Sequence, residues 1–328
     1  MGKFALSSFR FCASRSVRYD AALMAEDGSS AWGTLKALAC FSPVYAGSLD
    51  RLNSHAMANS AAPSLSPSNS PAAPDAIILA AGKGKRMTGA AGGPDGQPLP
   101  KVLYPVAGKP MVWWVVKACQ AAGVARCIIV IGYEGQQVRD ALKGEAGCHF
   151  VEQTEQLGTG HATQMAAPLF ENRPASDVFV LAGDGPLIRE ATLSQLLDVH
   201  RKSSAASTLA TAILDDPTGY GRVIRESDGS LSAIIEHKDA TAQQLACKEV
   251  NPSYYLFRSD ELFSTLDKVR PNNSQGEYYL TDVPGMLKRE GQTVKVVDAV
   301  PQEDVHSVNN PEQLALVDRL MRERLLRK

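Results

Sequence analysis

The chain from residue 75 onward predicts a doubly wound α/β domain with a small antiparallel insertion. Apolar, β-rich runs alternate with amphipathic stretches between residues 76 and 201. The runs at 76–81 and 177–182 are apolar nearly throughout, as are strands that are buried on both faces of a parallel sheet. After residue 214 the pattern changes to shorter pieces broken by glycine and proline. Strand, helix, strand, helix followed by short broken strands therefore favours a mixed sheet with right-handed crossovers.

The individual elements follow from the same patterns. Candidate strands cover residues 76–81, 126–132, 149–152, 177–182, 207–214, 249–257 and 294–300. Candidate helices cover residues 111–122, 135–142 and 193–201. We expect a last helix with Asn310 as N-cap and Pro311 at its first position. Its apolar stripe is Leu314, Val317, Met321 and Leu325.

Composition restricts the possible partners. Lys and Arg number 34 against 35 Asp and Glu, so the net charge of −1 creates no strong field toward nucleic acid or an anionic membrane. The six cysteines are scattered without a CxxC pair, which indicates free thiols in a reducing compartment. No apolar run approaches the ~18 residues needed to span a bilayer. We expect a soluble, cytoplasmic protein with small-molecule substrates and neither nucleic acid nor membrane as partner.

Residues 1–74 are predicted to be a disordered extension and linker. Residues 59–74 are rich in Ser, Pro, Ala and Asn, a composition that cannot bury enough apolar surface to order itself. Residues 1–19 carry four basic residues and no acidic one, which is similar to a transit peptide. The alternative, which we favour, is a start assigned too early, with Met24 or Met57 as the true beginning. The domain is then expected at 75–309 and the terminal helix at 310–328.

The strongest chemical signal is the segment LAAGKGKRM at residues 79–87, directly after the first strand. Two glycines among small residues let the backbone approach a ligand closely, and successive N–H groups can cradle phosphate oxygens. Lys83, Lys85 and Arg86 add positive charge. The segment matches neither GxGxxG nor a Walker A loop, which argues against a dehydrogenase or an ATPase.

A second basic position follows in the segment LPKVL at residues 99–103. Lys101 comes directly after a proline in a loop that enters a helix, where it can meet an anion. A solvated loop lysine is the alternative.

The polar segment EQTEQLGTGHA at residues 152–162 is a candidate for base recognition. Amide side chains and glycine backbone can read a base edge through paired donors and acceptors. The alternative is a polar loop that caps a helix, and His161 at a helix start is interpreted as structural.

A carboxylate ends the second buried strand, in the segment VLAGDGPL at residues 180–187. Asp184 at the ligand edge of an α/β sheet is a good Mg²⁺ ligand, because Mg²⁺ prefers hard oxygen donors and takes only one or two from the protein. A surface turn aspartate is the alternative.

Together these motifs resemble the uridylyltransferase domain of bifunctional bacterial N-acetylglucosamine-1-phosphate uridylyltransferases, in the sugar-phosphate nucleotidyltransferase family. The resemblance covers residues 76 to 325, with the motifs in the family's order. Four further segments extend it, at residues 216–222, 235–241, 273–282 and 308–310. It implies a Rossmann-like mixed sheet of the nucleotide-diphospho-sugar transferase type.

The resemblance also implies an activity and its residues. The activity is transfer of UMP from UTP to N-acetylglucosamine 1-phosphate with Mg²⁺, giving UDP-N-acetylglucosamine for cell-wall peptidoglycan. It implies Arg86 and Lys101 on the phosphates, and Asp184 and Asn309 on the metal. The substrate-binding residues that it implies are Leu79, Ala80, Ala81, Gly82, Gln153, Gln156, Gly158, Thr159, Ala182, Gly183, Gly221, Glu236 and Asn251.

Several departures from the family pattern affect specificity. The family commonly shows Gly-Asp-Val-Pro where this chain has Gly185 after Asp184, and Asn-Thr-Gly where it has Asn251-Pro252-Ser253. Because Pro252 removes a backbone donor near the expected sugar pocket, another sugar or another base remains a rival interpretation. A nucleotide-sugar-binding regulator without catalysis is the second rival. We find no hexapeptide repeat, so neither a left-handed β-helix nor acetyltransferase activity is expected, and the oligomeric state is left open.

Overall fold

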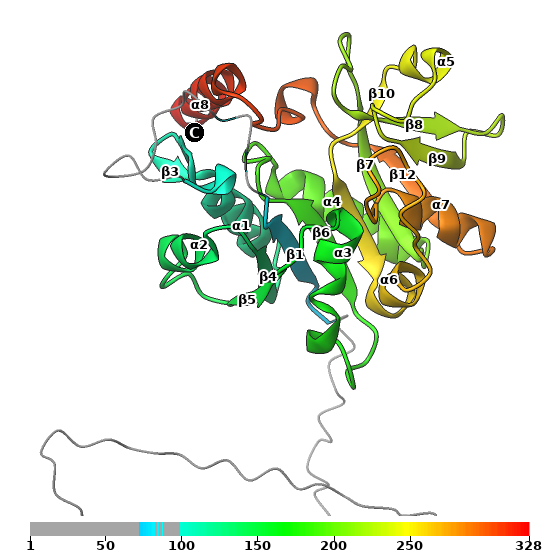
Figure 1. Cartoon of the computed structure of the whole chain (residues 1–328), viewed down its shortest axis with the longest axis horizontal. Helices are drawn as coiled ribbons and strands as arrows, with labels where there is room; N and C mark the ends of the chain where they lie inside the picture. Colours follow the sequence, from blue (N-terminus) through cyan, green and yellow to red (C-terminus); the bar gives the residue numbers. More distant parts are fainter. Residues whose placement is uncertain (1–71, 83, 85–86, 88–98, 328) are drawn as a thin grey trace, which may run out of the picture. The chain divides into compact units, whose positions relative to one another are not determined.

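A computed structural model describes residues 72–82, 84, 87 and 99–327 of the 328-residue chain. The predicted disordered linker lies almost entirely outside these residues, as do Lys83, Lys85 and Arg86. The described part is built on one mixed sheet, with strand order β5-β4-β1-β6-β11-β7-β10-β8-β9 and β12 paired to β7 (Figure 1). None of its helices is long and apolar enough to cross a membrane.

The first half of the sheet is parallel, as predicted. β1 (Asp75–Ala80) lies between β4 (Arg126–Ile131) and β6 (Asp177–Ala182), and β5 (Cys148–Glu152) is the outer strand. The central side chains of β1 and β6 are almost all buried. Their continuous apolar sequence is therefore explained by helices on both faces.

The second half of the sheet is mostly antiparallel. It contains β7 (Ser207–Ile213), β8 (Gly221–Arg225), β9 (Leu231–Ile235), β10 (Glu249–Asn251), β11 (Tyr254–Arg258) and β12 (Val294–Asp298). β11 runs antiparallel to β6 and β7, while β12 runs parallel to β7. The predicted insertion thus extends the same sheet sideways through β10, β8 and β9.

The prediction of one strand over residues 249–257 is wrong. The structure breaks it into β10 and β11 at Pro252 and Ser253, and Ser253 has a φ of 65°. Proline cannot donate to a strand ladder and a positive φ turns the chain, so the two strands can occupy different places in the sheet.

Helices cover both faces of the sheet. On one face lie α1 (Met111–Ala121), α2 (Gly135–Ala141) and α4 (Glu190–Lys202), whose buried residues share a core cluster with β1 residues Ala76 and Ile78. The opposite cluster, around Ile77, contains residues of α3 (Thr159–Gln164), α6 (Ser259–Leu266) and α7 (Asp282–Arg289). α4 begins three residues before the predicted start at 193, because Leu193 and Leu196 mark only its buried stripe.

The last helix, α8 (Pro311–Leu326), has the predicted start. The Asn310 side chain accepts a hydrogen bond from the Gln313 amide, and Pro311 occupies the first turn. Val317 and Met321 are buried in a third core cluster with Val308 and with Val106 of the β2–β3 hairpin (Pro105–Val106 and Lys109–Pro110). The predicted apolar stripe is wrong at Leu325, which is 40% exposed because the last turn extends beyond this cluster.

Four short elements complete the described chain. They are the 3-10 turns η2 (Lys101–Leu103), η3 (Ala167–Leu169) and η4 (Gln302–Asp304) and the single-turn helix α5 (Ala242–Leu245). η2 carries Lys101 of the candidate site, and η4 precedes the segment that contains Asn309.

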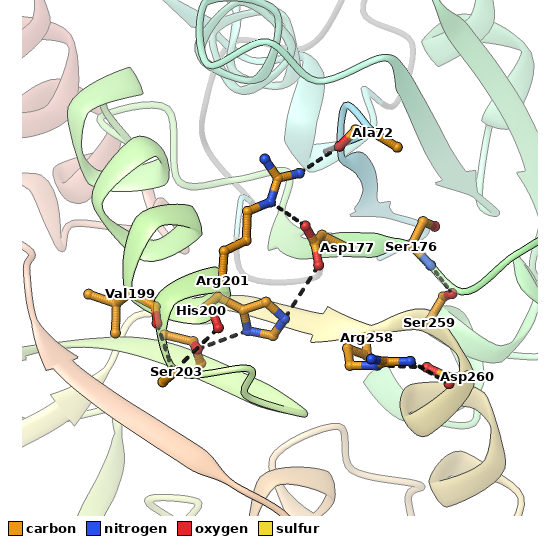
Figure 2. Close-up of polar contacts among 11 residues, drawn as sticks. Ala72, Ser176, Asp177, Val199, His200, Arg201, Ser203, Arg258, Ser259 and Asp260 are labelled. Atoms are coloured by element: carbon orange, nitrogen blue, oxygen red, sulfur yellow. Dashed lines mark hydrogen bonds and ion pairs between the residues drawn. The ribbon is translucent and has the colours of Figure 1, made fainter. Parts of the chain in front are cut away.

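The amino ends of the parallel strands carry a network of charged side chains. The Asp177 carboxylate at the start of β6 accepts a hydrogen bond of 2.6 Å from Arg201 Nε. Arg201 also donates to the carbonyl of Ala72, just before β1 (Figure 2). Asp75 at the start of β1 is paired with Arg126 at the start of β4. These pairs fix the strands at this edge, and they leave the opposite, carboxyl edge for a ligand.

Candidate active site

A cavity of about 300 Å³ opens at the carboxyl edge of the parallel strands. The predicted site residues that line it are Leu79, Ala81, Gly82, Lys101, Gln153, Gln156, Gly158, Thr159, Ala182, Asp184 and Glu236. They come from the ends of β1 and β6, from η2, from the loop after β5 and from the end of β9. The fold therefore brings together motifs that are far apart in the sequence.

Lys101 connects two segments at the mouth of this cavity. Its ammonium forms an ion pair with the Asp184 carboxylate and donates a hydrogen bond of 3.1 Å to the Asn309 side-chain oxygen. Asp184 follows β6, whereas Asn309 lies just before α8, and the Val308 amide donates to the Asp184 carbonyl at 3.1 Å. The two predicted metal ligands thus meet around one cationic group.

The chain approaches Lys101 closely on the side of the phosphate loop. A Cβ at Gly84 would lie 2.8 Å from the Lys101 Cβ, and Gly84 has a φ of 61°. Only glycine combines that conformation with that contact. Lys101 is consequently situated between the segment predicted to hold phosphates and the pair Asp184 and Asn309.

Gly183 explains how the two central strand ends approach each other. Its amide donates to the Leu79 carbonyl at 2.9 Å, and a Cβ at this position would lie 2.9 Å from the same oxygen. A larger residue would separate the ends of β1 and β6, so Gly183 shapes the site without lining the cavity.

The predicted base-recognition loop is held by hydrogen bonds to the segment 277–280. The Gly160 amide donates to the Tyr278 carbonyl, the Tyr278 amide to the Leu157 carbonyl, and the Leu280 amide to the Thr159 hydroxyl at 3.1 Å. Gln153, which is buried, has its amide nitrogen 3.2 Å from the Gly158 carbonyl and 3.0 Å from His161 Nδ1. The loop is therefore a fixed surface.

We expect Gly158→Ala to damage this surface strongly. Gly158 has a φ of 112°, and a Cβ there would lie 2.6 Å from the Tyr278 carbonyl oxygen. Strain plus overlap should lower the free energy of unfolding by about 3 kcal/mol. Gly276→Ala is the matched control, because Gly276 has a φ of 65° but open space around it, and should cost about 1 kcal/mol. Equal losses in urea unfolding of the two variants would contradict the steric account.

Acidic side chains form the wall away from Lys101. Glu236, at the end of β9, lines the cavity with Glu277 and Thr281. Burial is the main cause that raises the pKa of Glu236, and the carboxylates of Asp239 and Asp282 raise it further. Such a group can accept hydrogen bonds from a neutral polyol.

Asn251 lies behind this wall. Its side-chain nitrogen donates to the Tyr255 hydroxyl at 2.5 Å and its oxygen accepts from the Ser253 amide at 3.1 Å. Both Tyr255 and Ser253 line the cavity, whereas Asn251 does not, so its contacts position the lining. Gly221 pairs with Asn251 between β8 and β10 and likewise lies outside the lining.

Ala80 is 1% exposed and belongs to the core beneath the cavity. Arg86 lies outside the described residues, so its predicted role stays a prediction. Lining residues that had no predicted role are Val102, Ala162, Val180, Leu181, Ser253, Tyr255, Glu277, Leu280 and Thr281. Glu277, Leu280 and Thr281 fall in the segment 273–282 that supported the resemblance, which was the one available signal for them.

A larger cavity, of about 590 Å³, lies between α1, the residues after Pro186 and α8. None of the predicted site residues lines it. Cavity size alone would favour it, but the convergence of glycine backbone, amides, a lysine and carboxylates is found only around the smaller cavity within the described part of the chain.

Comparison with known proteins identifies the family of the chain. The model of the MobA-like NTP transferase domain matches residues 76–269. The chain belongs to the MobA-like NTP transferase family. A bifunctional GlmU protein from Geobacillus thermodenitrificans is 43% identical over 253 residues, which are 77% of this chain and 53% of that protein. A GlmU from Heliobacterium modesticaldum has the same identity and coverage. The resemblance stated from the sequence motifs is thus confirmed.

Solved structures confirm the fold class. A UDP-glucose pyrophosphorylase bound to UDP-glucose superposes with a TM-score of 0.62 at 17% identity, covering 77% of this chain and all of the other. Its apo form gives 0.61. The chain spans about half the length of the GlmU proteins it matches, so the activity of those whole proteins is not transferred by the match.

Proposed function

We propose that this protein transfers UMP from UTP to N-acetylglucosamine 1-phosphate, producing UDP-N-acetylglucosamine and pyrophosphate with the help of Mg²⁺. The observation that carries the proposal is the meeting of Lys101, Asp184 and Asn309 beside a cavity bounded by the loop at 79–82 and the amides at 153–156. Phosphates, a divalent cation and a base each find suitable groups there.

The donors fit Mg²⁺. Asp184 and Asn309 offer a carboxylate and an amide oxygen, which are hard donors, and both oxygens contact the Lys101 ammonium. The described residues contain no group of three or more His, Cys, Asp or Glu side chains that could hold a metal, in agreement with an ion that takes one or two protein ligands and completes its shell with phosphate and water. When bound, Mg²⁺ would neutralise the charge on the triphosphate.

The chain's own residues then act by positioning. An ionised oxygen of the sugar phosphate forms a bond to the α-phosphorus, and the bond from that phosphorus to the bridging oxygen breaks, releasing pyrophosphate. Because the attacking oxygen is already ionised at neutral pH, no general base is needed. Lys101 supports this transfer with positive charge, and Arg86 is proposed to do so as well.

A substrate panel tests the proposal. UTP, dTTP, CTP and GTP are combined with N-acetylglucosamine 1-phosphate and glucose 1-phosphate, with and without Mg²⁺, and pyrophosphate release is measured. We expect turnover only with Mg²⁺ and fastest with UTP and the amino sugar. If another pair turns over while UTP and the amino sugar are inert, the substrate assignment is wrong.

A sister specificity for another sugar is the second candidate, and one observation favours it. Ser253, next to Pro252, lines the cavity at a φ of 65° in the place where the family pattern has threonine and glycine. The glucose 1-phosphate arm of the panel decides between the two sugars.

We further expect His161→Ala to weaken discrimination between UTP and CTP. Both hydrogens of the Gln153 amide nitrogen are directed to Gly158 and His161, so the amide oxygen is left to accept from a ligand. Uracil offers a ring N–H at the position where cytosine offers an acceptor. Without His161 the amide can flip, and the ratio of kcat/KM for UTP over CTP should fall about tenfold. His149→Ala, on exposed residue 149 of β5, should leave the ratio unchanged.

A further inference from the structure

We infer that, without nucleotide, the Lys101 ammonium occupies the position where the divalent cation binds. The Lys101 side chain leaves this position when the metal and the triphosphate bind together. The inference deepens the proposed function and rests on it for the identity of the cation. The juxtaposition that suggests it is the Lys101 ammonium in contact with the Asp184 carboxylate and with the Asn309 side-chain oxygen, 3.1 Å away.

The Lys101 ammonium contacts both of the oxygens that are proposed to bind the divalent ion, one from Asp184 and one from Asn309. A carboxylate and an amide oxygen from segments 125 residues apart in sequence are held side by side by that single group, and the backbone bond from Val308 to Asp184 fixes the same two segments. The oxygens are therefore arranged for a cation before any metal arrives. Without a cation between them, the half-buried Asp184 carboxylate would lose its ion-pair partner.

A divalent ion and the ammonium compete for the Asp184 and Asn309 oxygens that the ammonium contacts. Both are cations, and two positive charges in contact repel strongly in a partly buried site, since the side chains of Lys101 and Asp184 are only 17% and 16% exposed. Metal binding at Asp184 therefore requires Lys101 to move.

The neighbourhood of Lys101 gives it a second destination. Lys101 and Gly82 line the same cavity, and a Cβ added at Gly84 would lie only 2.8 Å from the Lys101 Cβ, so the loop passes close to Lys101. The lysine side chain has four rotatable bonds, so its ammonium can turn from Asp184 to an anion lying on the loop at 79–82 without movement of the backbone. A triphosphate supplies that anion at the moment when the metal takes the oxygens.

Two properties of the free enzyme follow. Bare divalent ions should bind weakly, because they must displace the ammonium without offering it another partner. Divalent ions with a triphosphate should bind well, because the displaced ammonium gains a phosphate. Lys101 thus couples metal binding to nucleotide binding.

The test is a Mn²⁺ titration of the nucleotide-free full chain, with free Mn²⁺ followed by electron paramagnetic resonance. We expect Lys101→Met to bind Mn²⁺ at least about tenfold more tightly than the wild type, because the competing charge is gone. Lys101→Arg, which keeps the charge, should remain as weak as the wild type. Lys109→Met is the matched control for loss of one positive charge, since Lys109 is an exposed residue of β3 that contacts the Trp113 ring; it should leave Mn²⁺ affinity unchanged.

A double variant tests whether the additional Mn²⁺ affinity depends on the Asp184 carboxylate. Adding Asp184→Asn to Lys101→Met should remove the gain in affinity, and circular dichroism confirms that each variant is folded. Mn²⁺ affinity in Lys101→Met that equals or falls below that of the wild type overturns the inference, and so does a gain that survives Asp184→Asn. If Lys101→Met does not fold, Lys101→Gln replaces it in the same titration.

The outcome is separable from that of the proposed function. Wild-type turnover with UTP and the amino sugar phosphate, together with an unchanged Mn²⁺ affinity in Lys101→Met, removes the exchange and keeps the enzyme. No turnover with any substrate pair, together with the tenfold gain, removes the enzyme and keeps the exchange.

Discussion

Asp184→Ala is expected to reduce kcat for pyrophosphate release by about 10³-fold or more while the protein remains folded. Asp184 is the only carboxylate in contact with Lys101 among the described residues, and its backbone carbonyl also receives the Val308 amide, which the substitution keeps. Because the substitution keeps this backbone bond, the variant should remain folded. Nucleotide binding, measured by calorimetry with UTP, should weaken much less than turnover does.

Two further variants test whether the loss of turnover is specific to the charge of Asp184. Asp184→Asn keeps the size but removes the charge, so it should lose nearly as much turnover as Asp184→Ala. Asp198→Ala, which removes an exposed carboxylate of α4 that pairs with Lys202, should have wild-type kcat. Wild-type turnover in Asp184→Ala would remove this residue from the mechanism and favour a binding protein without catalysis.

The sequence predicted the parallel half of the fold well, because the relevant signals are local. The apolar runs that became β1 and β6 are buried on both faces, and that burial is what made them apolar throughout. The start of α8 was predictable for a similar reason, since Asn310 and Pro311 satisfy the first turn by themselves. Pro252 also offered a local signal for the break between β10 and β11, but the β-rich residues on either side concealed it.

The site was predictable only in part, because its residues meet through tertiary structure. Asp184 and Asn309 lie 125 positions apart and contact the same lysine, and no spacing rule predicts that; the family resemblance placed them together. Asn251 directs its amide to Tyr255 and Ser253, which line the cavity, so its expected contact with the sugar stays a prediction. Which residues line a cavity and which support the lining depends on side-chain packing.

Asp304 was not singled out by the sequence, yet its side chain is buried and paired with two arginines. The carboxylate of Asp304, which ends η4, is 1% exposed and forms ion pairs with Arg189 and Arg324. Arg324 on α8 also donates to the Leu187 carbonyl at 2.7 Å, three residues after Asp184. The Asp304 carbonyl accepts from the Tyr254 hydroxyl at 3.2 Å. One buried carboxylate thus ties together α8, the loop after β6 and the segment that leads to Asn309.

We therefore expect Asp304→Asn to lower the free energy of unfolding by about 3–5 kcal/mol, since the carboxylate is buried and is the one ion-pair partner of the Arg324 guanidinium among the described residues. For a domain of this size the Tm should fall by about 10 °C. Burial lowers the pKa of Arg324, so its charge is the more costly one to leave unpaired.

Differential scanning calorimetry measures the loss of stability in Asp304→Asn. Glu303→Gln is the control, because Glu303 is 53% exposed and, in the part of the chain that the structure describes, forms an ion pair with Arg189 alone, so the change should stay within about 0.5 kcal/mol. Since the same carboxylate fixes the segment that carries Asn309, kcat measured well below the Tm should fall about tenfold in Asp304→Asn and stay unchanged in Glu303→Gln. A stable Asp304→Asn variant with normal kcat would mean that the packing of α8 alone positions Asn309.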